Sequence, residues 1–448
     1  MLGRPFREEL LRGSSVNIAF IVSNLLIQLV AGLAIAAFLG PEGVGAFAVG
    51  MLVLDFSMVL VHLPGVAFVR EFSSREREEA LATVAALKLL LCIPASAAIL
   101  ILAGPLASAF RVSPLMIALL GLYPPLSAVA SIATMVFEAR RKMGRRNLPG
   151  LAENVARLGA VIALTSGAVL LPSRPDAAAL AWVLGAIPSA AVSFALAGFP
   201  DLRLLHLERA RDYFSFGWRT TLAHLLQKQL LWVGTAAIYL AFLPSSLALA
   251  QSESGLFKIS YSMMFYIVLL GSAVPAMLYP LLARAFALED EAARRAEVHR
   301  LLSIAFYAEV VLAAPLAVAL VLAAPWAFSA LLPGFSAAAP LAQLLAVSGV
   351  LFCLTLPAAV LLPASNRPDL ILRLFVAQAA VAVALNAILV PQTGAPWGGA
   401  MGAVIADWVT AAVGLAYAHA LVRKLGIPPP SFATFRAAFE RGTPQAPS

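Results

Sequence analysis

The sequence has little charge for its length. Of its 448 residues, 12% are Asp, Glu, Lys or Arg, while 61% are hydrophobic. A soluble domain carries about 25% charged residues, because its whole surface faces water. The shortage of charge therefore excludes a soluble fold and predicts a protein whose outer surface contacts lipid.

The chain also has few residues of the kinds that catalysis and metal binding use. It contains two cysteines and five histidines, and the histidines are scattered without the spacing of metal ligands. Cys92 and Cys353 fall in apolar runs, which is typical of free buried cysteines. There is no GxxxxGK[ST] motif, and no polar stretch is long enough for a nucleotide-binding or glycosyltransferase domain. We therefore expect neither an enzyme nor a protein with a metal or cofactor.

Long apolar runs are what the sequence has in abundance. Runs of roughly 20 apolar residues, enough to cross about 30 Å of hydrocarbon, must be helices, because lipid satisfies no backbone hydrogen bond. Prolines such as Pro124, Pro125 and Pro275 interrupt several runs and predict kinked helices. The sequence thus predicts an all-α integral membrane protein with about twelve spans, at 14–38, 44–66, 81–104, 114–136, 149–172, 176–199, 217–242, 250–278, 301–324, 340–363, 369–390 and 398–422.

Basic residues predict the orientation of these spans. Nearly all of the 31 Lys and Arg lie at the N-terminus, after even-numbered spans, as in ARRKMGRR (139–146), or in the C-terminal tail. Between spans, only Arg111 and Arg174 fall on the opposite side. The positive-inside rule then predicts cytoplasmic termini in a multi-pass membrane protein. Basic loops beside anionic lipid account for the net charge of +8, so no nucleic-acid partner is expected.

An even number of spans permits two six-helix halves in the same orientation. At an offset of 226 residues, three residues of the first half fall on identical residues of the second: Pro114 on Pro340, Arg141 on Arg367 and Trp182 on Trp408. The pattern predicts an N-terminal bundle (1–200), a cytoplasmic linker that forms an interfacial helix (201–216), a C-terminal bundle (217–424) and a cytoplasmic tail (425–448).

Polar residues inside the spans are candidates for a functional site, because polar groups in lipid usually face the protein interior. Asn24 and Gln28 share one face of the first span, and His224, Lys228 and Trp232 share one face of the seventh. The two amides either hydrogen-bond neighbouring helices or line a cavity. His224 is either a core histidine or a proton carrier.

Lys228 is the strongest of these candidates. It lies eleven residues after Gly217, about 16 Å along a helix and thus near the membrane midplane. That depth is beyond the reach of a snorkelling side chain. Lys228 therefore either pairs with a buried carboxylate or faces a water-filled cavity.

Three other cations lie inside spans, and each has two interpretations. Lys88 and Lys258 either snorkel to the headgroups or line the cavity. Arg157 follows Glu153 by four residues, so it either forms an ion pair within its helix or meets a cargo.

Several segments resemble the polysaccharide-biosynthesis flippases, a family of the multidrug/oligosaccharidyl-lipid/polysaccharide (MOP) exporter superfamily. These segments are FLGPEGVGAFAVGMLVLDF (38–56), VREF (69–72), LLPGFSAAAPLAQLLAVSGVLFCLTLPAAVLLPASNRPDLILRL (331–374) and LNAILVPQTGAPWGGAMGAVIADW (385–408). The resemblance implies two six-helix bundles around a central cavity, as in MATE exporters. It also implies a task, which is to flip a polyprenyl-diphosphate-linked oligosaccharide to the outer leaflet by alternating access.

That task gives the polar residues provisional roles. Lys228 would bind the diphosphate, and the sugar hydroxyls would suit Asn24, Gln28, Asp55 and Trp232. The partners would be the lipid-linked glycan, membrane lipids and other polysaccharide-assembly proteins.

Two alternatives stay open at this point. In a MATE-type, cation-coupled exporter of small molecules, Asp55 and Asp407 would bind the coupling ion. Asp55 has a third interpretation, as the partner of a lysine. In a non-transporting scaffold, changes of charge inside the spans would be tolerated.

Overall fold

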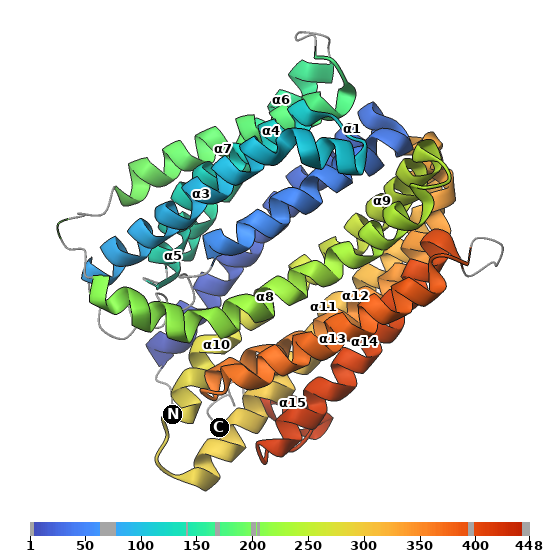
Figure 1. The fold of residues 1–448 in the computed structure, drawn as a ribbon. Helices are drawn as coiled ribbons and strands as arrows, with labels where there is room; N and C mark the ends of the chain where they lie inside the picture. Colours follow the sequence, from blue (N-terminus) through green and yellow to red (C-terminus); the bar gives the residue numbers. More distant parts are fainter. Residues whose placement is uncertain are drawn as a thin grey trace. The chain divides into compact units, whose positions relative to one another are not determined.

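The computed structural model describes residues 4–62, 78–139, 142–165, 171–198, 203, 207–392 and 398–440. No strand occurs in these ranges. They form a 3-10 helix (Pro333–Ala338) and, in chain order, the helices of Figure 1: α1 (Arg4–His62), α3 (Glu78–Phe110), α4 (Pro114–Gly121), α5 (Tyr123–Ala139), α6 (Met143–Thr165), α7 (Arg174–Ala197), α8 (Leu207–Phe242), α9 (Leu247–Gly271), α10 (Ala273–Phe286), α11 (Glu291–Leu331), α12 (Ala339–Ala364), α13 (Pro368–Leu389), α14 (Gly399–Lys424) and α15 (Phe432–Glu440).

Described helices occupy each of the twelve expected spans, at least in part. Among the described residues, nine helices are long and apolar enough to cross a membrane. One of them, Val22–Met58, covers most of the first two expected spans, and the break between them lies at Gly40. The φ of 68° at Gly40 favours glycine, and Pro41 then begins the second helix. Helices α6 and α8 occupy the two remaining spans. The prediction of an all-α membrane fold is therefore confirmed.

Breaks in two other spans lie close to prolines, as expected. Span 114–136 consists of α4 and α5, which are separated at Leu122, just before Pro124 and Pro125. Span 250–278 consists of α9 and α10, which meet at Ser272, three residues before Pro275. Proline has no backbone N–H to donate and its ring crowds the preceding turn, so a helix tends to break there.

The chain forms two compact units. The N-terminal unit comprises Met1–Ile259 and Phe328–Ser336, and the C-terminal unit comprises Ser260–Ala327 and Ala337–Ser448. In the N-terminal unit α6 packs against α7 and α1, and α5 packs against α7. In the C-terminal unit α12 packs against α10 and α14, and α13 packs against α14. Residues 207–216 of the expected linker are the first turns of α8. The division into six-helix bundles at 201–216 stays a prediction.

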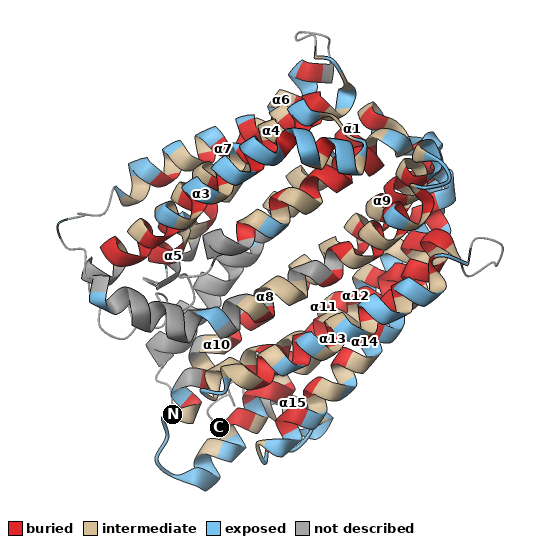
Figure 2. Ribbon diagram, in the orientation of Figure 1, coloured by how far each residue is buried: buried red, intermediate tan, exposed pale blue. Residues whose placement is uncertain are grey.

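The distribution of buried residues is that of a protein in lipid (Figure 2). Large apolar side chains such as Ile101 (78% exposed) and Leu322 (75% exposed) lie on the outside. The buried face of α7 is made largely of small residues, including Ala178, Gly185 and Ala186. Small residues let helix backbones approach closely, and lipid replaces water as the solvent of the large ones.

Candidate functional site

A buried polar network surrounds Arg157 in the N-terminal unit. Its guanidinium forms an ion pair with Glu153 on the same helix, α6. The guanidinium carbon also lies 3.6 Å from the centroid of the Trp182 ring on α7. On the other side, the Tyr123 hydroxyl of α5 donates to Oε1 of Glu153 at 2.9 Å. The expected ion pair within the helix is confirmed, and it neutralises the one cation of this network.

The network extends to α1 through a pair of asparagines. Nη1 of Arg157 donates to Oδ1 of Asn154 at 3.3 Å, and Nδ2 of Asn154 donates to Oδ1 of Asn24 at 3.3 Å. Asn24 thus makes a hydrogen bond to a neighbouring helix, as one of the two interpretations of its amide expected. Gln28 lies one turn further along α1 and is half-buried. Together these contacts hold α1, α5, α6 and α7 around a buried ion pair.

A second charged cluster joins α1, α8 and α9. The ammonium nitrogen of Lys258 lies 3.3 Å from the centroid of the Trp232 ring, a cation–π contact. The carboxylate of Asp55 acts electrostatically on the same ammonium. Asp55 therefore interacts with a lysine, as one of its interpretations expected. Trp232 is buried, so its ring covers the ammonium inside the N-terminal unit.

Lys88 on α3 is held within the protein. It is 2% exposed, and its ammonium donates to the Ser131 hydroxyl of α5 at 2.8 Å. Cys92 lies one turn away on the same face and is free, as is Cys353. The hydrogen bond to Ser131 holds the ammonium between α3 and α5, inside the N-terminal unit.

The two polar residues of greatest interest on α8 lie outside the described side chains. Lys228 and His224 belong to α8, which is helical through both positions. Nothing further is described of either side chain, so their roles in binding cargo stay predictions.

Two carboxyl groups are buried in the C-terminal unit. Asp407 on α14 lies beside Ser348 of α12 and Tyr261 of α9, and its Oδ2 has no hydrogen-bond partner among the described residues. Glu309 on α11 is 0% exposed, and both its carboxyl oxygens lack such a partner in the described part of the chain. Glu309 was not predicted as a site residue, although it is an acidic residue inside the predicted span 301–324.

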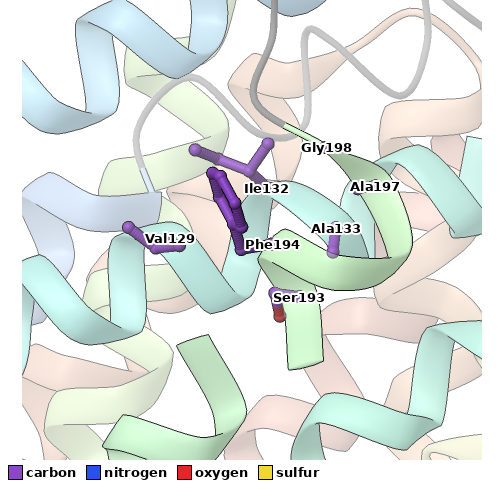
Figure 3. Close-up of a pocket in the computed structure, with 7 residues that line it drawn as sticks. All are labelled: Val129, Ile132, Ala133, Ser193, Phe194, Ala197 and Gly198. Atoms are coloured by element: carbon purple, nitrogen blue, oxygen red, sulfur yellow. The ribbon is translucent and has the colours of Figure 1, made fainter. Parts of the chain in front are cut away.

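A shallow pocket lies between α5 and α7 of the N-terminal unit (Figure 3). Its lining is almost entirely apolar and consists of Val129, Ile132, Ala133, Ser193, Phe194, Ala197 and Gly198. The polar atom among these side chains, the Ser193 hydroxyl, donates to the Ala130 carbonyl oxygen at 3.3 Å. No charged side chain lines this pocket, so it offers no ion-pair partner to a charged headgroup.

Metal binding finds no support in the described ranges. They contain no group of three or more His, Cys, Asp or Glu that would hold a metal ion.

Comparison with known proteins identifies the class. The profile of the family described as "Polysaccharide biosynthesis protein" matches residues 10–286, which is more than half of the chain. The chain therefore belongs to the polysaccharide biosynthesis protein family. No curated protein sequence gives a significant match.

Solved structures with the same fold are membrane transporters. An outward-facing multidrug resistance MATE family transporter of the MOP superfamily aligns with a TM-score of 0.67 at 16% identity, over 95% of this chain and 97% of that chain. An inward-facing structure of such a transporter gives 0.63 at 16% identity, over 92% and 99%. A MATE structure in a straight conformation gives 0.67 at 15% identity, over 93% and 96%. The fold is thus that of the MATE and MOP transporters, and the helices of membrane length indicate a multi-pass membrane protein.

Proposed function

We propose that this protein flips a polyprenyl-diphosphate-linked oligosaccharide from the cytoplasmic to the outer leaflet of the bacterial inner membrane by alternating access. The observation that carries the proposal is membership of the polysaccharide biosynthesis family in a chain whose fold is that of a transporter. A membrane-spanning chain of this family serves glycan synthesis most simply by moving the glycan. Other polysaccharide-assembly proteins would supply and receive that cargo.

The charges inside the spans support an anionic headgroup as the cargo. Transfer of a diphosphate from water into the membrane costs its hydration, and a cationic lining offsets that cost through charge-assisted hydrogen bonds. Lys228 is the primary candidate because it lies at mid-span without a nearby acidic residue on its helix. Arg157, Lys258 and Lys88 are secondary candidates, because each first has to leave the partner described above.

The remaining polar residues would contact the sugars. Asn24 and Gln28 on α1 present amides, and Asp55 presents a carboxylate, all of which pair with hydroxyl groups. Trp232 would supply an apolar face for a sugar ring, and His224 would add a hydrogen bond beside Lys228. The lipid tail would remain in the bilayer.

A cation-coupled exporter of small molecules is the second candidate. The fold of the MATE transporters favours it, as do Asp55 and Asp407, whose carboxyl groups would bind a coupling ion. A cationic drug prefers an acidic lining, whereas a diphosphate prefers a basic one, so the two candidates make opposite demands on the same spans.

Deletion of the gene separates the two candidates. The strain without the protein is compared with a complemented strain for surface glycan by staining, and for growth against a panel of cationic drugs. The proposal expects loss of surface glycan, accumulation of the lipid-linked precursor and unchanged drug tolerance. Normal surface glycan with increased drug sensitivity would replace the flippase by the exporter.

A further inference from the structure

Glu309 lies at a point where three helices of the C-terminal unit meet. A methyl group added to Gly271, at the end of α9, would lie 2.8 Å from Oε2 of Glu309 and 2.6 Å from Sγ of Cys353 on α12. The carboxyl group therefore occupies the space that glycine leaves open at position 271. The Glu309 side chain reaches this space from α11, and no part of Glu309 is exposed.

The surroundings of this carboxyl group are apolar. Cys353 belongs to a buried cluster with Ile267, Ala313, Ala317 and Ala346. The Cys353 thiol donates to the Ile267 carbonyl oxygen at 3.6 Å, so its hydrogen is directed away from Glu309. No described basic side chain forms an ion pair with Glu309, and neither oxygen accepts a hydrogen bond from a described residue.

A bare carboxylate in such a place is very unfavourable, since an isolated buried charge costs many kcal/mol. The group must therefore hold a cation. A hard metal ion takes about six oxygen ligands, and Glu309 itself supplies only two. A proton needs one oxygen and no other ligand, and it restores neutrality to the apolar site.

We propose that Glu309 is a proton-binding site that is loaded and emptied during transport. The part of this proposal that concerns transport rests on the proposed function, whereas proton binding does not. The coupled ion would then be a proton held on α11, a helix on which no site residue was predicted.

Other titratable groups near Glu309 are few. On α12, Cys353 is a titratable neighbour of Glu309. On α9, the neighbours Ile267 and Gly271 carry no titratable side chain. From α14, the His419 ring lies 5.6 Å from the Phe306 ring on α11, and its Nδ1 lies 2.9 Å from the Leu415 carbonyl oxygen. Asp407 also lies on α14 but is placed beside Ser348, three turns before His419.

Infrared difference spectroscopy of the purified protein in lipid nanodiscs tests proton binding directly. A protonated carboxyl in an apolar site gives a C=O stretching band that disappears when the proton leaves. We expect the wild type to lose such a band as pH rises, Glu309→Gln to lack it and Asp407→Asn to keep it. A band that Glu309→Gln leaves intact would overturn the proposal, as would a Glu309 band that never changes with pH.

A second variant, Gly271→Ala, keeps the proposal testable if Glu309→Gln does not fold. Gly271→Ala crowds the carboxyl group without removing it, so the pH at which the Glu309 band disappears should shift relative to the wild type. An unchanged midpoint in a folded Gly271→Ala protein would contradict the location of the site.

Transport into proteoliposomes, with a fluorescent polyprenyl diphosphate disaccharide as the probe, separates this proposal from the proposed function. One coupled proton allows up to about tenfold accumulation of the probe per unit of pH difference. We expect Glu309→Gln to lose this gain and to retain exchange without a gradient. Equal accumulation of the probe by both proteins under a pH difference would refute proton coupling by Glu309 without contradicting the flippase. A titrating Glu309 band in a protein that does not move the probe would refute the flippase and leave the proton site standing.

Discussion

The guanidinium carbon of Arg157 lies 3.6 Å from the centroid of the Trp182 ring, while the same guanidinium pairs with Glu153 one turn earlier on α6. One side chain thus joins α6 to α7 by stacking and neutralises a partly buried carboxylate. A buried pair contributes little net stability when complete, but removal of one partner leaves the other charge uncompensated.

Arg157→Gln should therefore destabilise the protein by about 1–3 kcal/mol, because Glu153, whose side chain is 17% exposed, is left without its cation. The double variant Glu153→Gln with Arg157→Gln should recover a large part of the loss. Thermal unfolding of the purified proteins in detergent measures both effects. Equal unfolding temperatures for the single and double variants would show that the charge pair is not what matters.

Close helix packing between α1 and α9 predicts a strict requirement for glycine. A Cβ atom at Gly45 would lie 1.9 Å from the Gln251 carbonyl oxygen, and one at Gly255 would lie 2.0 Å from the Pro41 carbonyl oxygen. Both contacts are with backbone, which cannot move aside cheaply. Gly45→Ala should cost about 1–3 kcal/mol or more, as overpacking does.

The matched control is Gly159→Ala on α6, where an added Cβ would have no atom within 4 Å. That variant should unfold at the wild-type temperature or slightly above it, because alanine favours helices. If Gly45→Ala were as stable as Gly159→Ala, the two helices would not approach as closely as described.

Lys228→Ala should abolish export of the glycan while the protein remains in the membrane. The physical reason is the loss of the charge that offsets dehydration of the diphosphate. Lys142→Ala serves as the control, because Lys142 is an exposed cation in the loop before α6. Surface glycan staining and immunoblots of membranes measure the outcome. Export by Lys228→Ala at the level of Lys142→Ala would remove Lys228 from the site.

Local patterns in the sequence predicted much of the fold. Apolar runs of membrane length predicted the spans, and the break between the first two lies at Gly40, between the two predicted runs. The Glu153–Arg157 pair was visible because both residues lie on one helix at a spacing of four.

Contacts between distant segments could not be read in the same way. The Lys258 ammonium meets Trp232 across two helices, and Lys88 meets Ser131, which is 43 residues away. Polar residues on one face of a single helix do not show which residues of other helices lie opposite them. Within the predicted span 301–324, Glu309 shares its face of α11 with no other polar residue. Its importance therefore emerges only from its position beside Gly271 and from the absence of described partners.

Movement of a lipid diphosphate glycan across a bilayer is the most direct test of the account. Proteoliposomes with the fluorescent polyprenyl diphosphate disaccharide in both leaflets are treated with a membrane-impermeant quencher, with empty liposomes and a cationic dye as controls. The account predicts that the protein makes the inner-leaflet probe accessible to the quencher, and that the dye is not transported. Transport of the dye with no movement of the disaccharide would contradict it.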